Sequence, residues 1–404
     1  MSGCRVCQSH IEGFIDFGRM PLANGFLGPD QFAGEYYFHL SAAYCPRCTL
    51  VQLVEQPERE RMFNERYPFF SATSVRMQEH FAALAASVIA TLPSRDPFVV
   101  EIGSNDGTLL RHIANAGIRH LGVEPSASVA STAIAGGVST MCRFFDTEVA
   151  RAIVAAHGHA HAIIGANTLS HVADLHAVVE GIAILLAPAG RCVIEDPYWG
   201  TVVAETAFDQ IYDEHASYFT LSSLSYLFAE HGLAVLDVIP ADVHGGSMRY
   251  VIGRPESQPA AARVERLLEH ERAMGLHRPE TFAGFRDRVT NTGMALMTLL
   301  RRCKAEGLRT VGYGATSKST TTINFFGITP DLVEFISDTT PAKQGLFSPG
   351  AHIPVRPHAE FVARYPERAL LFLWNHAAEV RAKEAAFARS GGKWIVYVPA
   401  VQEW

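Results

Sequence analysis

The sequence carries no excess of basic residues and no long apolar run. Its 34 Lys and Arg are outnumbered by 41 Asp and Glu, and the formal net charge is −7. The basic surface that nucleic-acid binding requires is therefore not expected. Apolar runs such as Ile182 to Pro188 are far shorter than the roughly 20 residues that cross a bilayer. We expect neither a nucleic-acid nor a membrane partner.

Residues 1–20 contain no basic segment followed by an apolar core. We therefore expect no signal peptide and a soluble, cytoplasmic protein. The 404 residues are 48% hydrophobic, with 32 Gly and 21 Pro, a composition typical of globular proteins. This length predicts two or three domains, and we expect a monomer or a small homo-oligomer.

The seven cysteines are few and unevenly spread, and four of them form two Cys-x2-Cys pairs: Cys4 with Cys7, and Cys45 with Cys48. An odd total without a secretion signal argues against a disulfide framework. Two such pairs can supply four thiolates to one tetrahedral zinc, which leaves no position for water, so the predicted zinc is structural. Reduced thiols or a redox disulfide are the alternatives, and His10 is an alternative ligand.

A buried strand is predicted at Phe98–Ile102, and it runs directly into the loop Gly103–Gly107. A helix and a second strand, His120–Val123, follow, and the strand ends in the acid Glu124. This order opens a nucleotide-type α/β unit, in which the terminal acid can accept hydrogen bonds from a ribose. An ordinary strand–helix turn with a solvated acid is the alternative.

The loop lacks the three-glycine dinucleotide pattern and starts with an acid, Glu101-x-Gly103. This pattern resembles the S-adenosylmethionine (SAM) site of class I methyltransferases, and SAM has no pyrophosphate that a glycine cradle would have to hold. The resemblance implies that Glu124 holds the SAM ribose and that Gly103 and Asn105 flank its methionine portion. Glu101 belongs to the same predicted cofactor site.

The later part of this unit continues the same α/β pattern. Ala162–Asn167 is predicted as the central fourth strand, Leu175–Leu186 as a helix and Arg191–Glu195 as the fifth strand. The stretch from Asn167 to His171 would then lie at the carboxyl edge of the sheet, beside the SAM sulfonium.

The segment Asp209–Phe219 places Tyr212, Glu214 and His215 within four positions. A histidine beside a carboxylate is suited to general base catalysis. The alternative for these residues is a helix N-terminus with solvated acids.

Residues from Ala260 to Lys304 mix Arg and Glu, and we expect a partly solvated helix pair there. The next stretch, Thr310–Ser319, is predicted as a strand and a glycine loop. It nearly matches a P-loop, and with Asp338 a dinucleotide fingerprint, but each match lacks a glycine. We expect neither site. A smaller second Rossmann-like sheet is predicted, with Lys318 at a helix N-terminus that can meet a pyrophosphate.

The predicted fold class is α/β. Residues 1–68 form a small zinc-binding module, residues 69–252 a Rossmann-like class I SAM-methyltransferase domain, and residues 253–404 a helical region followed by the second Rossmann-like domain.

A series of short motifs runs along nearly the whole chain in a fixed order. They are the two Cys pairs, Met20–Asn24, Tyr67–Ser71, Glu101–Gly107, Asn167–His171, Tyr212-x-Glu214-His215, His244–Ser247, Gly312–Ala315, Asp338 with Lys343–Gly345, and Trp374-Asn375. In this order and spacing the chain resembles the nucleotide-sugar C-methyltransferases of deoxysugar and antibiotic-sugar biosynthesis.

The resemblance implies a SAM-dependent methylation at C-3 of a 4-keto sugar attached to a nucleoside diphosphate, usually dTDP. It implies that His215 is the base and that Glu214 orients or charges the site. Tyr212, Tyr67 and His171 would line the sugar pocket. Weaker candidates for the nucleotide phosphates are Arg249, Ser317 and Lys318.

The chain departs from this family near the expected sugar and nucleotide sites. Asp213 stands where a histidine is usual, Phe69 where a tyrosine is usual, and Ser317-Lys318-Ser319 where a Lys-Gly-Asn run is more usual. The alternatives are an O- or N-methyltransferase, an NAD-linked sugar oxidoreductase and a non-catalytic sugar-nucleotide-binding protein.

Overall fold

The computed structural model describes residues 3–62 and 75–404. The described residues form three sheets, with helices packed on them, so the predicted α/β class is confirmed. Predictions that fall on Tyr67 and Phe69 lie outside the described residues. No helix in the described part of the chain is long and apolar enough to cross a membrane.

The N-terminal sheet is antiparallel and has the strand order β1-β2-β3-β9. Its strands are β1 (Glu12–Pro21), β2 (Tyr37–Tyr44), β3 (Val51–Leu53) and β9 (Ser217–Tyr218), and the short helix α1 (Arg59–Met62) follows β3. The edge strand β9 comes from the middle of the chain, directly after the predicted base His215. The zinc module therefore shares a sheet with the predicted catalytic segment.

The middle sheet has the order β10-β11-β8-β7-β4-β5-β6 and is parallel apart from β11. Its strands are β4 (Phe98–Ile102), β5 (Arg119–Val123), β6 (Thr140–Met141), β7 (Ala160–Ala166), β8 (Leu186–Pro197), β10 (Ala234–Ala241) and β11 (Ser247–Gly253). The strand predicted as central, β7, lies at the centre. The fifth strand, β8, begins at Leu186 and not at Arg191, because the Pro188–Gly190 stretch continues the strand.

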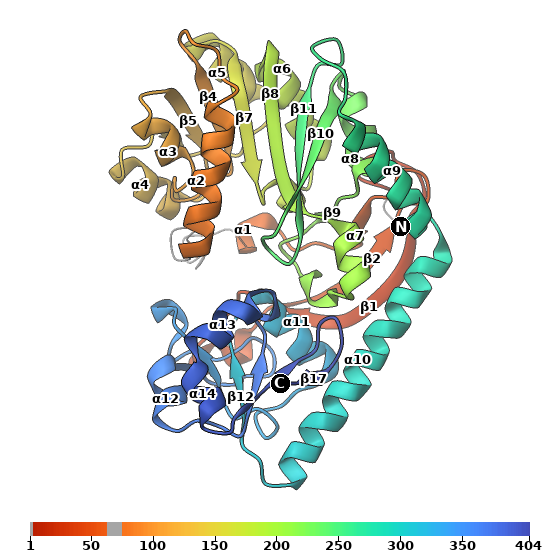
Figure 1. Cartoon of the computed structure of the whole chain (residues 1–404), viewed down its shortest axis with the longest axis vertical. Helices are drawn as coiled ribbons and strands as arrows, with labels where there is room; N and C mark the ends of the chain where they lie inside the picture. Colours follow the sequence, from red (N-terminus) through yellow and green to blue (C-terminus); the bar gives the residue numbers. More distant parts are fainter. Residues whose placement is uncertain (1–2, 63–74) are drawn as a thin grey trace.

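Helices cover both faces of the middle sheet (Figure 1). They are α2 (Val75–Ile89), α3 (Leu110–Asn115), α4 (Ala127–Ala135), α5 (Thr147–His157), α6 (Leu175–Leu185) and α8 (Leu221–Ala229). Val99 packs with α2 and α3, whereas Phe98 and Val100 pack with α5, α6 and α8. The strand is thus buried on both faces, which explains its unbroken apolar run.

The C-terminal sheet has the order β14-β13-β12-β15-β16-β17 and is parallel apart from β17. Its strands are β12 (Thr310–Tyr313), β13 (Ile336–Asp338), β14 (Val355–Pro357), β15 (Arg368–Leu371), β16 (Lys393–Val396) and β17 (Gln402–Glu403). Its helices are α11 (Ser317–Phe326), α12 (His358–Ala363), α13 (Ala377–Lys383) and α14 (Ala385–Arg389). This is the second Rossmann-like sheet that the sequence predicts.

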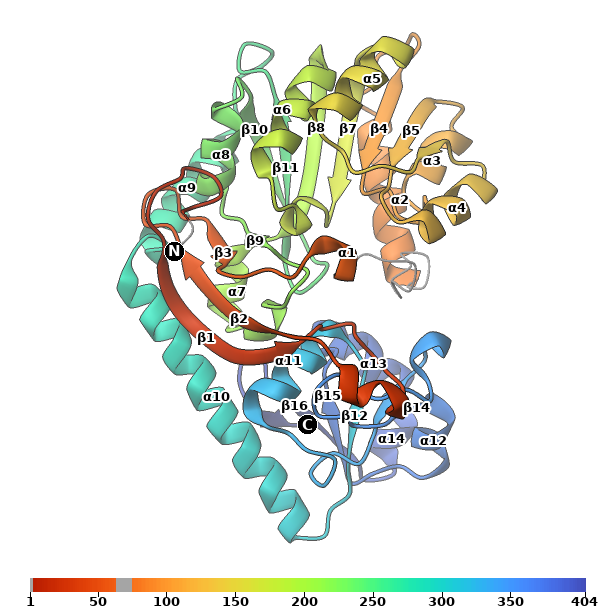
Figure 2. The same cartoon turned by 180° about the vertical axis from the view of Figure 1, so that it is seen from behind.

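The middle and C-terminal sheets lie one above the other, and the N-terminal strands run along both (Figure 2). The predicted helix pair is α9 (Ala262–Met274) and α10 (Pro279–Ala305), and the long α10 runs along the side of the molecule. The ring of Phe282 in α10 stacks on Tyr44 of β2 at 3.8 Å and lies 4.9 Å from Phe14 of β1. Trp199 in α7 (Trp199–Glu205) joins the same aromatic cluster, which ties the zinc module to the rest of the chain.

Candidate active site

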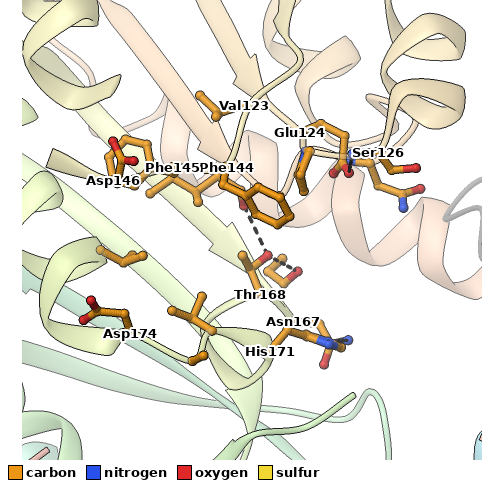
Figure 3. Close-up of a pocket in the computed structure, with 18 of the residues that line it drawn as sticks. Val123, Glu124, Ser126, Phe144, Phe145, Asp146, Asn167, Thr168, His171 and Asp174 are labelled. Carbon is orange, nitrogen blue, oxygen red and sulfur yellow. Dashed lines mark hydrogen bonds between the residues drawn. The ribbon is translucent and has the colours of Figure 1, made fainter. Parts of the chain in front are cut away.

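A cavity of about 760 Å³ opens at the carboxyl end of the middle sheet. Its walls come from the ends of β4, β5 and β7, from α2, and from the N-terminal module. Figure 3 shows Glu124 and Ser126 on one wall and Thr168 and His171 on the opposite wall. Ligands of parallel α/β sheets bind at this edge, so the cavity lies where the sequence predicts the cofactor.

The turn that follows β4 and lines the cavity requires glycine at position 103. Gly103 has a φ of +70°, and a Cβ placed on it would lie 2.6 Å from Thr168 Oγ1. The hydroxyl of Thr168 donates to the carbonyls of Ile102 and Ala166, each at 3.1 Å. The backbone of the loop can therefore approach a ligand that a side chain would exclude.

Glu124 is held in a fixed orientation at the end of β5. Its Oε2 accepts the backbone N–H of Asn105 at 2.9 Å, and its Oε1 accepts that of Ser126 at 2.8 Å. Burial raises the pKa of this carboxyl, and the two backbone donors oppose the rise. The remaining acceptor sites of a carboxylate held in this way suit a ribose diol.

The residues present fit SAM. Phe144 and Phe145 give the cavity an apolar wall, and Asn167 lines it with a buried Oδ1 that has no hydrogen-bond partner among the described residues. Glu101, which the sequence predicts in this site, is buried in β4 beneath the loop and is not part of the cavity wall. A contact of Glu101 with the cofactor stays a prediction.

The segment with the predicted base lies next to this cavity. The Tyr212 hydroxyl lies 3.0 Å from Nε2 of His215, and the His171 ring meets the His215 ring edge-on at 4.9 Å. His171 also lines the cavity, with its Nε2 3.4 Å from Nδ2 of Asn167. The structure thus brings together three of the predicted catalytic residues and the predicted Asn167.

The acids of this segment are not solvated, which excludes the alternative of an exposed helix N-terminus. Asp213, Glu214 and His215 are exposed by only 2%, 4% and 3%. Asp213 Oδ1 accepts the backbone N–H of Ala23 at 2.8 Å, and Glu214 Oε1 accepts Nδ2 of Asn24 at 2.6 Å. Glu214 also lines a second cavity of about 270 Å³ beside the N-terminal module.

The imidazoles around the site are held neutral. Burial lowers the pKa of His171 to about 4 and that of His244 to about 4. Burial, followed by the charges of His171, His244 and Lys318, holds the pKa of His215 well below its usual range. A neutral imidazole is the form that can accept a proton.

The predicted phosphate ligands have different surroundings. Lys318 lies at the start of α11, next to Ser317, with its Nζ 5.8 Å from the centroid of the Trp374 ring. Burial lowers its pKa, and the charge of Asp209 opposes this.

Arg249 instead pairs with the buried Glu195 through its Nε at 3.0 Å and its Nη2 at 2.9 Å. Its guanidinium is thus committed to an internal carboxylate, which corrects the phosphate-binding prediction.

The glycine loop of the C-terminal sheet is satisfied internally. The two carboxylate oxygens of Asp338 accept the backbone N–H groups of Ala315 and Thr340, each at 2.7 Å. The ammonium of Lys343 donates to the carbonyl of Ala315 at 2.7 Å. These contacts place the Lys343 side chain against the loop that resembles a dinucleotide fingerprint.

The four paired cysteines meet in one cluster. Their Sγ atoms all lie within 4.8 Å of one another, with Cys4 and Cys48 at 3.4 Å and Cys7 and Cys45 at 3.4 Å. Four converging thiolates fit a tetrahedral zinc. The alternative ligand His10 is exposed and is not part of the cluster.

Two polar residues at the junction of the middle and C-terminal domains belong to motifs quoted from the sequence, which assigned no role to either of them. Asp209 is fully buried, and its Oδ2 accepts Nε1 of Trp374 at 2.8 Å and the hydroxyl of Tyr397 at 2.7 Å. His244 lines the large cavity from the β10–β11 turn with a φ of +53°. Its neighbours Gly245 and Gly246 were a visible signal for this turn.

Models of three domain families match the chain: a zinc binding domain over residues 4–63, a methyltransferase domain over residues 76–238 and a C-methyltransferase C-terminal domain over residues 242–399. The C-methyltransferase NovU of Streptomyces niveus is 35% identical over 402 residues, which cover 98% of this chain and 95% of NovU.

Among solved structures, a SAM-dependent methyltransferase from Anabaena variabilis matches 46% of this chain and 88% of its own, with 16% identity and a TM-score of 0.38. The magnesium protoporphyrin IX methyltransferase of Synechocystis PCC 6803 with bound SAM matches 44% and 79%, with 15% identity and a TM-score of 0.34. The sequence match along the whole length decides the family: the chain belongs to the SAM-dependent C-methyltransferases, together with NovU, and carries their zinc-binding domain.

Proposed function

We propose that the chain methylates C-3 of a 4-keto deoxysugar carried by a nucleoside diphosphate, with dTDP as the nucleotide. The observation that carries the proposal is the contact of the buried His215 with Tyr212 and His171 beside a cavity that fits SAM. A carbon nucleophile must be made by removing a proton, and this group holds a base and donors in one place.

The hydrogen on a carbon next to a ketone is too weakly acidic to leave unaided. His215 accepts this proton, and the C–H electron pair moves into the bond toward the carbonyl carbon, so negative charge develops on the ketone oxygen. Donors that face this oxygen lower the barrier. Tyr212, with its hydroxyl 3.0 Å from the base, and His171 are the proposed donors. SAM, when bound, supplies the methyl group that the resulting carbon nucleophile attacks.

The protonation state of the site supports this assignment. Burial and the nearby charge of Lys318 keep the pKa of His215 low, so the imidazole is neutral and ready to accept a proton at neutral pH. A diphosphate bound near Lys318 would offset that positive charge and would make His215 a stronger base.

Ser317 and Lys318 are the proposed contacts for the diphosphate. They stand at the first turn of the ten-residue helix α11, where backbone N–H groups and the helix dipole favour an anion. The ammonium of Lys318 adds a charge that is only partly balanced by Asp209.

The test is the incubation of the purified enzyme and SAM with the 4-keto-6-deoxysugars of dTDP, CDP and GDP. Mass spectrometry should detect a product that has gained one methyl group, and NMR should locate it on C-3. In D2O without SAM, the enzyme should exchange the C-3 hydrogen for deuterium, and His215→Ala should abolish this exchange. Methyl on oxygen or nitrogen, or no methylated product from any sugar, would contradict the proposal.

A further inference from the structure

The segment Tyr212–His215 lies where all three domains meet. Directly after it, β9 pairs with β3 of the zinc module, and the N–H of Leu53 donates to the carbonyl of Ala216 at 3.0 Å. Directly before it, the hydroxyl of Thr321 in α11 donates to the carbonyl of Ile211 at 3.1 Å. The backbone at both ends of the segment is therefore held by other domains.

The residue Ala23, which follows β1, is fixed on both sides of its backbone. Its N–H donates to Asp213 Oδ1 at 2.8 Å, and its carbonyl accepts the hydroxyl of Thr320 in α11 at 2.8 Å. Both hydrogen bonds are buried. Because donor and acceptor are both engaged, the backbone of the next residue, Asn24, has little freedom to shift.

The side chain of Asn24 is aimed at the second acid of the segment. Its Nδ2 donates to Glu214 Oε1 at 2.6 Å. A hydrogen bond to a carboxylate is stronger than one between neutral groups. Burial, and then the charge of Glu214, raise the pKa of the neighbouring Asp213 to about 8. The hydrogen bond from Asn24 holds one carboxylate oxygen of Glu214 in place.

We propose that Asn24 of the N-terminal module is a positioning residue for the reaction. It fixes the carboxylate of Glu214, the residue that precedes His215 in the chain. The backbone of Ala23, held by hydrogen bonds to Asp213 and Thr320, fixes the position of Asn24. The zinc module is then part of the catalytic apparatus and not only a folding unit. This inference rests on the proposed role of Glu214 in the active site.

The first test compares Asn24→Ala with Tyr44→Phe. The control removes a hydrogen bond of the same length, 2.6 Å, from Tyr44 to Glu12 in the same module but away from the segment. Asn24→Ala should lower kcat roughly 10- to 100-fold with an unchanged Kd for SAM. Tyr44→Phe should leave kcat unchanged. Equal kcat in wild type and Asn24→Ala would overturn the inference.

The second test uses the pH profile of Asn24→Asp, which a purely structural role would not alter. Two carboxylates at this distance repel each other when both are ionised, whereas a protonated Asp can again donate to Glu214. The activity of this variant relative to wild type should therefore rise as the pH falls. A constant ratio across the pH range would count against the inference.

A double-mutant cycle with Glu214→Gln distinguishes the proposed role of Glu214 from the positioning role of Asn24. Non-additive losses in kcat for Asn24→Ala and Glu214→Gln are expected, because both residues act through one contact. If Glu214→Gln alone leaves kcat unchanged, the proposed role of Glu214 fails. If Glu214→Gln lowers kcat but the losses are additive, only the positioning role of Asn24 fails.

Discussion

The hydroxyl of Tyr212 and Nε2 of His215 lie 3.0 Å apart, and His215 is only 3% exposed. This contact orients the imidazole, and the His215 ring also meets the ring of His171, which lines the cavity, edge-on at 4.9 Å. In the proposed reaction this neutral imidazole is the base, and the phenol beside it is one of the hydrogen-bond donors.

His215→Ala should lower kcat by roughly 10²- to 10⁴-fold, because the base acts in the transition state. Tyr212→Phe removes only the hydroxyl and should lower kcat less, by about tenfold. Both variants should bind SAM with the Kd of the wild type, measured by isothermal titration calorimetry. A His215→Ala variant with wild-type kcat would exclude His215 as the base.

The pH dependence of the wild type follows from the same residue. Because the pKa of His215 lies well below 6.5, this group stays neutral on lowering the pH from about 8 to about 6.5. The titration of His215 should therefore cause no fall of kcat/KM over that range. A rate profile that falls with a pKa near 7 and that loses this inflection in His215→Ala would contradict the expectation.

Glu124→Ala should weaken SAM binding roughly 10- to 100-fold, because the carboxylate offers acceptors for the ribose. Glu124→Gln keeps the size and one carbonyl acceptor and should lie between wild type and Glu124→Ala. At saturating SAM, kcat of both variants should stay close to that of the wild type. An unchanged Kd for Glu124→Ala would remove Glu124 from the cofactor site.

The local pattern of the sequence was enough to predict the strand Phe98–Ile102, which matches β4 residue for residue. A short apolar run that is buried on both faces and ends at a glycine with positive φ is typical of a central strand in a parallel sheet. The prediction was wrong at Pro188–Gly190, where turn residues continue β8. Leu186 pairs with Ala160 and Arg191 pairs with Ala162, so the residues between them form a bulge in the pairing with β7, which the local sequence does not show.

The sequence could not predict how the candidate site is assembled. Ser217 and Tyr218 form a strand only because β3, far away in the sequence, offers an edge. The contacts of Ala23 with Asp213 and Thr320 likewise join residues of three domains. Arg249 was predicted to bind phosphate because nothing in its local sequence shows that Glu195 of the neighbouring strand β8 neutralises it.

Asp213→Asn should stabilise the protein at alkaline pH. The pKa of Asp213 is raised by burial, and then by Glu214, from 3.8 in the unfolded chain to about 8 in the fold. Between these values the folded chain binds one proton more than the unfolded chain, so stability falls as the pH rises. Asn cannot ionise, and it can still accept the N–H of Ala23.

The measurement is the difference in Tm between Asp213→Asn and the wild type. It should be small at about pH 5 and should grow up to about pH 8.5 in favour of the variant. Asp287→Asn, in α10, changes a side chain that is 70% exposed and serves as the control for a charge change at the surface. A pH-independent difference for Asp213→Asn would exclude a carboxyl with a raised pKa at this position.

Loss of zinc should affect stability and the rate together. Cys45 and Cys48 form the turn that joins β2 to β3, and β3 in turn holds β9 next to His215. Cys45→Ser leaves three thiolates, which bind zinc less tightly, and should lower the zinc content and reduce Tm by roughly 5–10 °C. It should also lower kcat, because the pairing of β3 with β9 loosens.

Cys142→Ser, at an exposed thiol outside the cluster, should keep zinc, Tm and kcat. Metal analysis, thermal unfolding and steady-state kinetics check the three readouts, and a zinc-free Cys45→Ser enzyme with wild-type kcat would show that the module does not support the catalytic segment.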